Sequence, residues 1–483
     1  MRRRTLALAG SLAAGAVTAG SAVAFTLADT PRVSAAQVTG AAAHRPAQPG
    51  DFNGDGRRDL ALPNDEGNGA QAHHGRVIVV PGGPRGPLPA QADGVTLGRI
   101  GLPAQPESAE SFGGAAASAD FDRDGYADLA ASAWTQDEKT TGVVIVYGGP
   151  KGLTGRHVVL HGPVAGDLVA ADFDGDGRPD LAVLDRDAAS DGAFHYRTYA
   201  NLGASAVKPV VTKVTKSVSD SESLHGTAAD FNGDGKADLA LTFESWEDEG
   251  PRKASFGEVR YGSAKGLGAP KRFGTTWPYV QMAAGDVNGD HRADLVVRKY
   301  AAKGPWQIAV LYGGKAGLGK PVTFSKDTPG VPGKATRSDN FGYALAVGDL
   351  NADGLADVAV SAPRTDLGAA KGAGAVTVLY GTRKGLTGKG ARSVNLTVAG
   401  MPARPQKGEA FGTSLAVQDL NGDGRADLLI GSDTRTYPNK DYYGAIFYLP
   451  GGKGGPLVKG SSWITPATLR VKGNVQLGSN IMR

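Results

Sequence analysis

A nine-residue acidic loop that recurs seven times constrains the fold of this chain more than any other feature. The first copy, DFNGDGRRD, begins at Asp51, and the last, DLNGDGRAD, begins at Asp419. Successive copies start 69, 52, 58, 56, 63 and 70 residues apart. This spacing is typical of similar supersecondary units that share one continuous core. We therefore expect one repeat domain over residues 51–483.

Each loop places oxygen-bearing side chains at alternate positions. Asp or Asn occupies positions 1, 3, 5 and 9, and glycine at position 6 permits a tight curl in six of the seven copies. Together with the backbone carbonyl of position 7, these groups form a ring of hard oxygens, which favours Ca²⁺. Mg²⁺ needs a compact octahedron and retained waters, and Zn²⁺ would need His or Cys, which do not recur at loop positions.

The predicted calcium ligands are the side chains at positions 1, 3, 5 and 9 and the carbonyl at position 7. In order, they are Asp51, Asn53, Asp55, Arg57 and Asp59; Asp120, Asp122, Asp124, Tyr126 and Asp128; Asp172, Asp174, Asp176, Arg178 and Asp180; Asp230, Asn232, Asp234, Lys236 and Asp238; Asp286, Asn288, Asp290, Arg292 and Asp294; Asp349, Asn351, Asp353, Leu355 and Asp357; and Asp419, Asn421, Asp423, Arg425 and Asp427.

We expect up to seven calcium ions. For any one copy, an Asp-Asn-Gly turn without an ion is an alternative, but seven copies argue against it. Loop 286–294 is expected to be the weakest site, because His291 stands where the backbone needs the left-handed region. In loop 349–357, Ala352 replaces the first glycine, which is a milder change because Gly354 is kept.

Short apolar runs surround each loop and predict an all-β fold. A small-residue segment precedes the loop, an aliphatic run follows it, and two further strand-like segments are separated by Gly-rich turns. The unit is therefore four antiparallel strands with the acidic loop between the first and second. Seven such units predict a seven-bladed β-propeller; a linear β-solenoid is the alternative, but its rungs are usually far shorter. Ala115, Ala116 and Ala117 suit an innermost strand beside a central channel.

The repeats resemble the FG-GAP repeats that build the head of integrin α subunits. Phe112-Gly113, Phe341-Gly342 and Phe411-Gly412 lie eight residues before their loops, and Ser361-Ala362-Pro363 is close to the Gly-Ala-Pro element. The resemblance covers residues 51–483. It implies a propeller with calcium loops on one face and a partner site on variable loops of the other. Repeats 3, 4 and 5 depart from the motif, with Val164-Ala165, Glu222-Ser223 and Pro278-Tyr279 in its place, which leaves their strand starts open.

The N-terminal segment predicts export. Residues 1–24 have three arginines, an apolar stretch and an Ala-Val-Ala cleavage pattern, as a signal peptide does, and residues 25–50 resemble a flexible leader. A membrane anchor is the alternative, but the apolar stretch is only weakly hydrophobic. We expect a secreted, extracellular protein, in some settings associated with the cell surface, without membrane insertion after cleavage. Its lack of cysteine excludes disulfides, so burial and bound ions must supply its stability.

The charge pattern does not indicate nucleic-acid binding. The formal net charge is +4, yet the loops hold 23 of the 48 acidic residues, and the basic residues form no clustered stripe. A motif search also favours a non-enzyme, since there is no Gly-x-Ser-x-Gly elbow and no cysteine nucleophile. Carboxylate pairs could serve a glycosidase and bound Ca²⁺ a polysaccharide lyase, but the first are committed to metal and the second lacks an identifiable base.

The segments between the second and third strands predict a binding face. They vary in length and composition, and Trp134, Trp246, Trp306, Tyr437, Tyr442 and Tyr443 lie in or beside them. Aromatic side chains on a rigid frame suit protein or sugar contacts, although each could instead pack beneath its own loop. These aromatics do not repeat blade by blade, which favours an extracellular protein partner over a glycan; we expect a monomer that acts as an adhesion module.

The C-terminal residues LGSNIMR predict how the ring closes. They align residue for residue with FGTSLAV at 411–417, which precedes the last loop. The first loop has no such segment before it, because AAAHRPAQPG contains two prolines and no apolar alternation. We therefore expect residues 477–483 to form the first strand of repeat 1, with Arg483 beside Asp51.

Overall fold

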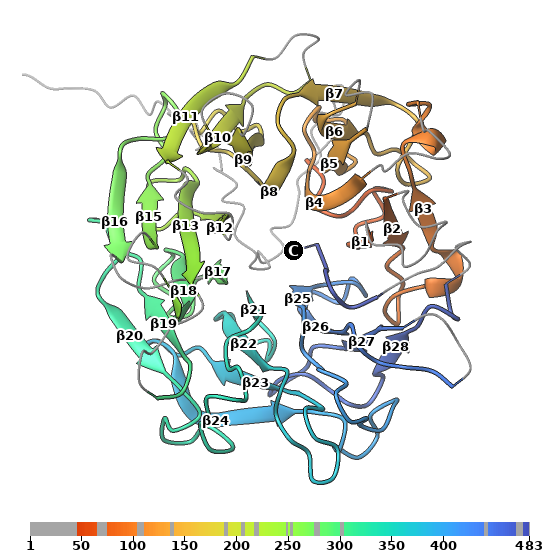
Figure 1. Cartoon of the computed structure of the whole chain (residues 1–483), viewed down its shortest axis with the longest axis vertical. Coiled ribbons are helices and arrows are strands. Elements are labelled where there is room, and N and C mark those ends of the chain that lie inside the picture. The colour runs from red at the N-terminus through yellow and green to blue at the C-terminus, as the bar shows by residue number, and fades with distance from the viewer. Residues whose placement is uncertain are drawn as a thin grey trace, which may run out of the picture.

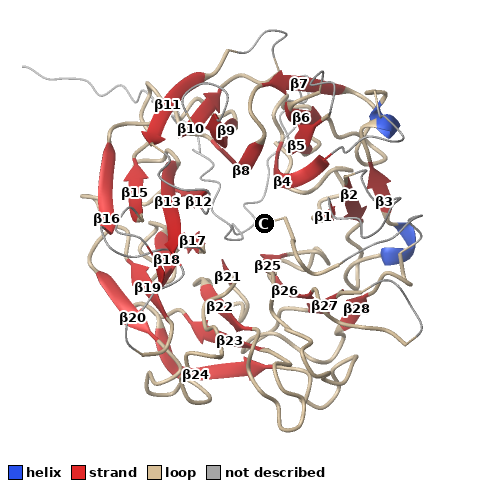
Figure 2. Ribbon diagram, viewed as in Figure 1, coloured by secondary structure: helices blue, strands red, loops and turns tan. Residues whose placement is uncertain are grey.

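The computed structural model describes residues 46–64, 75–103, 111–135, 140–187, 192–203, 208–216, 222–247, 250–251, 255–274, 281–299, 304–438, 443–469 and 477–482. In these residues seven antiparallel sheets surround a central axis as a seven-bladed β-propeller (Figure 1). Strands dominate, and the helices drawn in Figure 2 are two short 3₁₀ turns, η1 (Pro89–Gln91) and η2 (Gly98–Ile100). The predicted fold class is confirmed. The predicted signal peptide, 1–24, and leader residues 25–45 lie outside the described residues.

Each blade follows the chain outward from the channel. Blade 1 contains β1 (Leu60–Asn64), β2 (Arg76–Val80) and β3 (Asp93–Val95); blade 2 contains β4 (Ser111–Ala119), β5 (Asp128–Trp134), β6 (Gly142–Val146) and β7 (His157–His161); blade 3 contains β8 (Ala165–Ala171), β9 (Asp180–Asp187), β10 (Ala193–Tyr199) and β11 (Val210–Thr215). Blade 4 contains β12 (Glu222–Ala229), β13 (Asp238–Glu247), β15 (Phe256–Arg260) and β16 (Pro270–Gly274), with β14 (Gly250–Pro251) pairing β13.

The remaining three blades have the same order. Blade 5 contains β17 (Met282–Gly285), β18 (Asp294–Lys299), β19 (Gln307–Leu311) and β20 (Pro321–Phe324); blade 6 contains β21 (Leu345–Gly348), β22 (Asp357–Ala362), β23 (Ala375–Tyr380) and β24 (Thr387–Val394); blade 7 contains β25 (Leu415–Gln418), β26 (Asp427–Ser432), β27 (Ala445–Leu449) and β28 (Ser462–Ile464).

Every acidic loop after the first closes the hairpin between the first and second strands of its blade. The aspartate at position 9 begins the second strand and pairs with the residue just before the loop, as Asp357 pairs with Gly348 and Asp427 with Gln418. The same pairing occurs in blades 2 to 5. The loop is thus a fixed part of the strand ladder, as the sequence predicted.

The hydrophobic core lies between adjacent blades rather than within them. For example, one cluster joins Phe52 and Val77 of blade 1 to Leu129 and Val144 of blade 2. The residue at position 2 of each loop enters the gap before the next blade and is at most 1% exposed: Phe52, Phe121, Phe173, Phe231, Val287, Leu350 and Leu420. Each acidic loop is therefore anchored by a buried apolar side chain beside its polar ring.

The C-terminal segment lies where the missing innermost strand of blade 1 was predicted, although residues 477–482 are not a regular strand and the sheet of blade 1 has three strands, β1 to β3. The amide of Met482 donates to the carbonyl of Ala61 in β1 at 3.0 Å, the counterpart of the pairing of Ala416 with Leu429 in blade 7. Leu477 and Ile481 are each 2% exposed and pack between blades 7 and 1. The C-terminal end lies beside β1 and β25 in Figure 1. Arg483, predicted beside Asp51, lies outside the described residues.

The strand starts that the sequence left open differ between repeats 3, 4 and 5. Strands β8 and β12 begin at Ala165 and Glu222, which belong to the residue pairs aligned with Phe-Gly in repeats 3 and 4. In repeat 5, β17 begins only at Met282, after the aligned pair. The end of the predicted leader is also structured: Ala47 is buried, and its amide donates to Oδ2 of Asp120 at 3.0 Å. None of the described residues belongs to a helix of the length and apolarity needed to cross a membrane.

Candidate metal centres and the central channel

The acidic loops share one hydrogen-bonded conformation. In the first loop the amides of Asp55 and Gly56 donate to the two carboxylate oxygens of Asp51, both at 3.0 Å. The equivalent pair of bonds occurs in the other six loops at 2.8–3.2 Å. Position 1 therefore organises the curl that the alternating acidic pattern predicted.

Positions 3, 5 and 7 continue this pattern. In every loop, position 3 accepts the amide of position 5, and position 5 accepts the amide of position 7. The side chains at positions 1, 3 and 5 of each loop thus gather on the amides of one tight turn, but among the described residues three carboxylates come close enough to share an ion in only two loops. In loop 2, carboxylate oxygens of Asp120, Asp122 and Asp128 lie within 4.8 Å of one another, and those of Asp172, Asp174 and Asp176 do the same in loop 3.

The loops need left-handed backbone at two positions, not one. Position 6 has a positive φ throughout, and His291 adopts it at 64°, so loop 5 keeps the common conformation with the strained residue that the sequence indicated. Position 4 is also left-handed. It is glycine in five loops, but Arg123 and Ala352 adopt φ values of 63° and 61° there. Ala352 and His291 thus have the same left-handed backbone, so the backbone does not bear out the prediction that Ala352 is the milder of the two replacements.

The aspartate at position 9 is buried and bonded to the backbone. Its carboxylate accepts the amide of position 2 at 2.8–3.2 Å in all seven loops. In six loops it also accepts, at 2.8–3.0 Å, the amide of a glycine just after the third strand: Gly82, Gly148, Gly262, Gly313, Gly381 and Gly451. This aspartate ties the loop to the outer part of its own blade.

Burial raises the pKa of every aspartate at position 9, and neighbouring carboxylates raise it further. The pKa reaches about 7 for Asp59, Asp180, Asp238, Asp294 and Asp427, and about 8 for Asp128 and Asp357. A nearby cation favours the ionised form of such carboxyls and would lower their pKa. The donor set, all hard oxygens with unfavourable mutual repulsion, therefore fits a divalent cation such as Ca²⁺.

Basic side chains partly neutralise several loops. Arg57, Arg292 and Arg425 at position 7 lie 3.1–3.5 Å from the position-5 carboxylates of their own loops. In loop 2, Arg156 from the turn before β7 pairs with Asp122 and lies 3.6 Å from Asp124. These pairs are exposed enough to rearrange around a bound ion.

Two structural roles were not predicted from the sequence. One is the apolar side chain at position 2 that fills the gap before the next blade; its signal was present, because position 2 is Phe, Val or Leu in every copy. The other is the glycine after the third strand that donates its amide to the aspartate at position 9. A Cβ atom at Gly381 would lie 2.4 Å from the carbonyl oxygen of Ala356, so no larger residue fits without movement. The recurring glycine in segments such as YGG and PGG was the available signal.

The aromatic residues assigned to the binding face have different environments. The ring of Trp306 lies 3.8 Å from the guanidinium carbon of Arg298 and packs on the core between blades 5 and 6. The hydroxyl of Tyr437 donates to the carbonyl of Gly444, and its ring lies beside that of Trp463. Trp134 ends β5 half-buried, and Tyr443 accepts the amide of Leu477 through its carbonyl. Tyr442 and the side chain of Trp246 lie outside the described residues.

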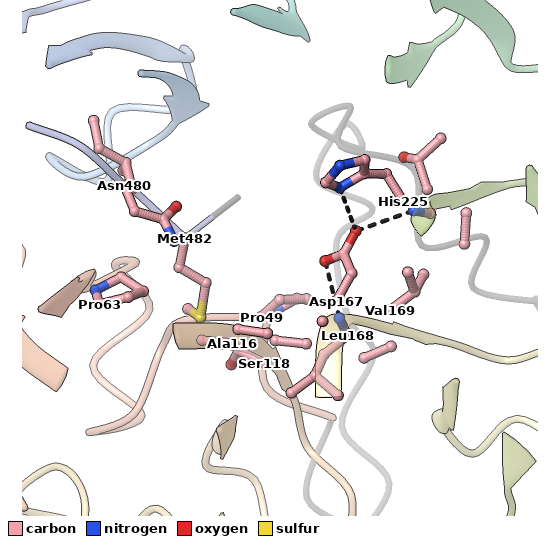
Figure 3. Close-up of a pocket in the computed structure, with 18 of the residues that line it drawn as sticks. Pro49, Pro63, Ala116, Ser118, Asp167, Leu168, Val169, His225, Asn480 and Met482 are labelled. Carbon is pink, nitrogen blue, oxygen red and sulfur yellow. Dashed lines mark hydrogen bonds and ion pairs between the residues drawn. The ribbon is translucent and has the colours of Figure 1, made fainter. Parts of the chain in front are cut away.

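A cavity of about 430 Å³ lies in the central channel, lined mainly by the first strands of blades 2 to 4 and by Ile481 and Met482 (Figure 3). Ala115, Ala116 and Ala117 line it, as expected for a crowded innermost strand. Asp167 and His225 face each other there, with Oδ2 and Nδ1 3.8 Å apart. The carboxylate of Asp167 also accepts the amides of Leu168 and Gly226. This pair therefore joins blades 3 and 4 across the channel wall.

Comparison with known proteins agrees with this geometry. The FG-GAP repeat model matches residues 112–147, 341–379 and 411–449, and an FG-GAP-like repeat model matches residues 172–241. The chain is a β-propeller that contains FG-GAP repeats in these segments, and it resembles the head of integrin α subunits.

Similar curated proteins include enzymes and integrins. Mouse phosphatidylinositol-glycan-specific phospholipase D is 36% identical over 164 residues, which is 32% of this chain and 19% of that protein. Human integrin alpha-IIb is 35% identical over 164 residues, 31% of this chain and 14% of the integrin. Integrin alpha-PS5 of Drosophila melanogaster is 40% identical over 93 residues, 19% of this chain and 8% of that protein. The alignments cover less than a fifth of these relatives, so they support the repeat rather than a whole-protein activity.

Proposed function

We propose that this chain is an extracellular, calcium-stabilised β-propeller that binds a protein partner and has no catalytic centre of its own. The observation that carries the proposal is the hydrogen-bonded loop conformation, with its buried carboxylate at position 9, that recurs in all seven blades. The likeness to the integrin α head implies calcium in such loops and a partner on the opposite face. The predicted signal peptide supports an extracellular location.

Calcium serves as a structural ion in this proposal. When bound, Ca²⁺ neutralises carboxylates that otherwise repel each other. The chain supplies the rest: position 1 holds the curl, position 9 clamps the third strand, and position 2 fills the gap before the next blade. Because the loop is continuous with the strand ladder, an ion on one face stiffens strands that run through to the other.

The partner face in this proposal consists of the connections between second and third strands. In blade 6, residues 364–374 form this connection, with Arg364, Asp366, Gly368 and Lys371 among the exposed or half-buried positions. The remaining connections differ in length and sequence. A rigid ring with variable connections is apt for specific protein contacts, because most of the ordering cost is met by the scaffold.

Calcium dependence is tested first on the chain alone. With extracellular Ca²⁺ at about 1 mM and a dissociation constant of about 0.1 mM, each site adds about 1.4 kcal/mol, or roughly 10 kcal/mol for seven independent sites. A strong chelator should therefore lower the melting temperature greatly, and elemental analysis should find several calcium ions per chain. A melting curve that ignores the chelator would rule out structural calcium.

Partner binding is tested by capture of extracellular proteins on the immobilised chain in calcium buffer and in chelator. A partner retained only in calcium is then titrated against two variants. Asp419→Ala with Asp423→Ala should weaken binding and lower the melting temperature, whereas Trp246→Ala should weaken binding alone. If both variants change stability and affinity together, scaffold and partner site are not separate. A glycan array positive for one sugar class would replace the protein partner with a carbohydrate.

A further inference from the structure

Neighbouring acidic loops are directly bonded to each other at five of the seven junctions among the described residues. At these five junctions the amide at position 8 of one loop donates to the carbonyl at position 1 of the preceding loop. The bonds are Ala127 to Asp51, Ala237 to Asp172, Ala293 to Asp230 and Ala356 to Asp286, each at 2.9 Å, and Arg58 to Asp419 at 3.4 Å. Position 8 lies between two predicted ligand positions, 7 and 9, so this bond fixes both.

A close side-chain contact accompanies each of these five bonds. The position-7 side chain of the following loop lies over the position-4 glycine of the preceding loop. A Cβ atom at that glycine would approach the neighbouring side chain to 2.6–2.9 Å: Gly54 beneath Tyr126, Gly175 beneath Lys236, Gly233 beneath Arg292, Gly289 beneath Leu355, and Gly422 beneath Arg57. A larger residue at position 4 would therefore displace the neighbouring position-7 side chain from this contact.

At two junctions of the described loops the position-8 bond is absent, and the residue at position 4 is not glycine. Between loops 2 and 3, position 4 is Arg123, and position 8 is Pro179, which has no amide hydrogen to donate. Between loops 6 and 7, position 4 is Ala352, and no bond joins Ala426 to Asp349. Loop 6 still accepts bonds from Gly452 and Gly454 in the turn after β27. The bond from Gly452 to Leu350 has counterparts at connected junctions, such as Gly149 to Phe52, so what this junction lacks is the bond from position 8 of the next loop. The two junctions at which position 4 has a side chain are thus the two junctions at which neighbouring loops are not bonded through position 8.

We propose that the seven cation sites act as two coupled arcs, one of loops 7, 1 and 2 and one of loops 3, 4, 5 and 6. This inference rests on the proposed calcium binding. A cation in one loop fixes the residue at position 1, whose carbonyl holds position 8 of the next loop. That contact orders the flanking ligands of the next site before its own ion arrives. By linkage the effect is reciprocal, so neighbours within an arc strengthen each other. The breaks at Arg123/Pro179 and at Ala352 isolate the arcs.

The test measures hydrogen exchange of each loop by mass spectrometry while the full chain is titrated with Ca²⁺. Asp230→Asn with Asp234→Asn disables loop 4, and Asp120→Asn with Asp124→Asn disables loop 2. The loop 4 variant should raise the half-maximal calcium concentration of loops 3 and 5 about tenfold. The loop 2 variant should raise that of loop 1 similarly and leave loop 3 within about twofold. Loop 3 is next to both disabled loops, so it is its own control.

A gain-of-contact variant protects the test against general destabilisation. Arg123→Gly with Pro179→Ala should join loop 2 to loop 3, so that adding the loop 2 changes then shifts loop 3 as well. Equal shifts in loop 3 from both disabled loops of the otherwise native chain, or no shift in any neighbour, would overturn the two arcs while leaving calcium binding intact. A native chain with no calcium-dependent protection in any loop would instead overturn the proposed function, and the arcs with it.

Discussion

Two groups of blades differ in the side chains that anchor the inner strand. One group contains blades 2, 6 and 7, and the other contains blades 3, 4 and 5. In the first group, a phenylalanine that is at most 2% exposed stands at the inner-strand start: Phe112, Phe341 and Phe411. The glycine after it has a φ of 83–103°. In blades 2 and 6 a serine of the second strand completes the turn, since Oγ of Ser361 accepts the amide of Ala344 at 2.8 Å and Ser132 accepts that of Ala115. We call these the Phe-Gly blades.

Blades 3, 4 and 5 place charged side chains at the equivalent end of the second strand, and we call them the charged blades. These residues are Asp185, Glu244 and Arg298, between 2% and 5% exposed. Asp185 forms a bidentate pair with Arg197, at 2.7 and 3.3 Å, and the guanidinium of Arg298 stacks on Trp306. Buried charge is costly unless paired, so these blades depend on particular partners, whereas the Phe-Gly blades bury an aromatic ring at the strand start, to which blade 7 adds the buried pair of Glu409 and Arg435.

The comparison explains why the acidic loop is more regular than the motif before it. The loop conformation needs particular side chains at most positions, because each carboxylate holds particular amides. The strand start needs only an anchor that is either apolar or fully paired. The sequence at the strand start can therefore vary while the seven blades still form a closed propeller.

The largest expected effect concerns blade 1, which obtains its anchor from the C-terminal segment. Leu477 donates its amide to Tyr443 as Phe411 donates to Ala373, so it occupies the Phe-Gly position. Deleting residues 477–483 removes three buried apolar side chains and should cost about 6 kcal/mol, measured by urea denaturation. Asn480→Ala, at an exposed position, should have little effect. A truncated chain as stable as the full one would mean that blade 1 needs no anchor.

Phe411→Ala tests the apolar anchor within a complete blade. The ring is fully buried against Phe447 at a centroid distance of 5.1 Å, so its removal should cost about 4 kcal/mol. Phe411→Leu is the matched control, because blade 1 already uses leucine; it should cost less than about 1.5 kcal/mol. If both substitutions are equally harmful in denaturant, the site requires the aromatic ring, and Leu477 is not its equivalent.

The same contrast marks how far the sequence could predict this structure. The seven blades, the loop conformation and the closing segment follow from repeated local patterns, and repetition makes such patterns reliable. The charged blades do not, because the pairing of Asp185 with Arg197 depends on strand register across the sheet rather than on neighbours in sequence. The inter-loop contacts were missed for a related reason. Glycine at position 4 indicates a turn, but only the ring geometry brings Tyr126 over Gly54.

Arg197→Leu tests the paired anchor of blade 3. It leaves the buried carboxylate of Asp185 without its bidentate partner and should cost about 3 kcal/mol. Changing both residues to leucine should recover most of the loss, since an apolar pair of similar volume replaces the ion pair. The double-mutant cycle is measured by chemical denaturation. If the double variant is less stable than the single one, the charges themselves are required, and the two kinds of anchor are not interchangeable.

Glu244→Gln tests the charged blade whose anchor is least well paired, and the expected effect depends on pH. Burial raises the pKa of Glu244 from 4.5 to about 7, although the charges of His225 and Arg298 act to lower it. One of its carboxylate oxygens, Oε1, has no hydrogen-bond partner. Between these two pKa values the folded state holds a proton that the unfolded state has lost, so this group makes stability fall as pH rises from about 4.5 to about 7. The loss amounts to about 3 kcal/mol at pH 8 and vanishes below pH 4.5.

Glutamine keeps the shape and cannot ionise, so the variant should match the native chain at pH 4.5 and exceed its stability at pH 8. Denaturation at both pH values in the same calcium concentration measures the difference. A variant less stable than the native chain at pH 8 would show that ionised Glu244 is a favourable anchor, and that the charged blades gain stability from their charges.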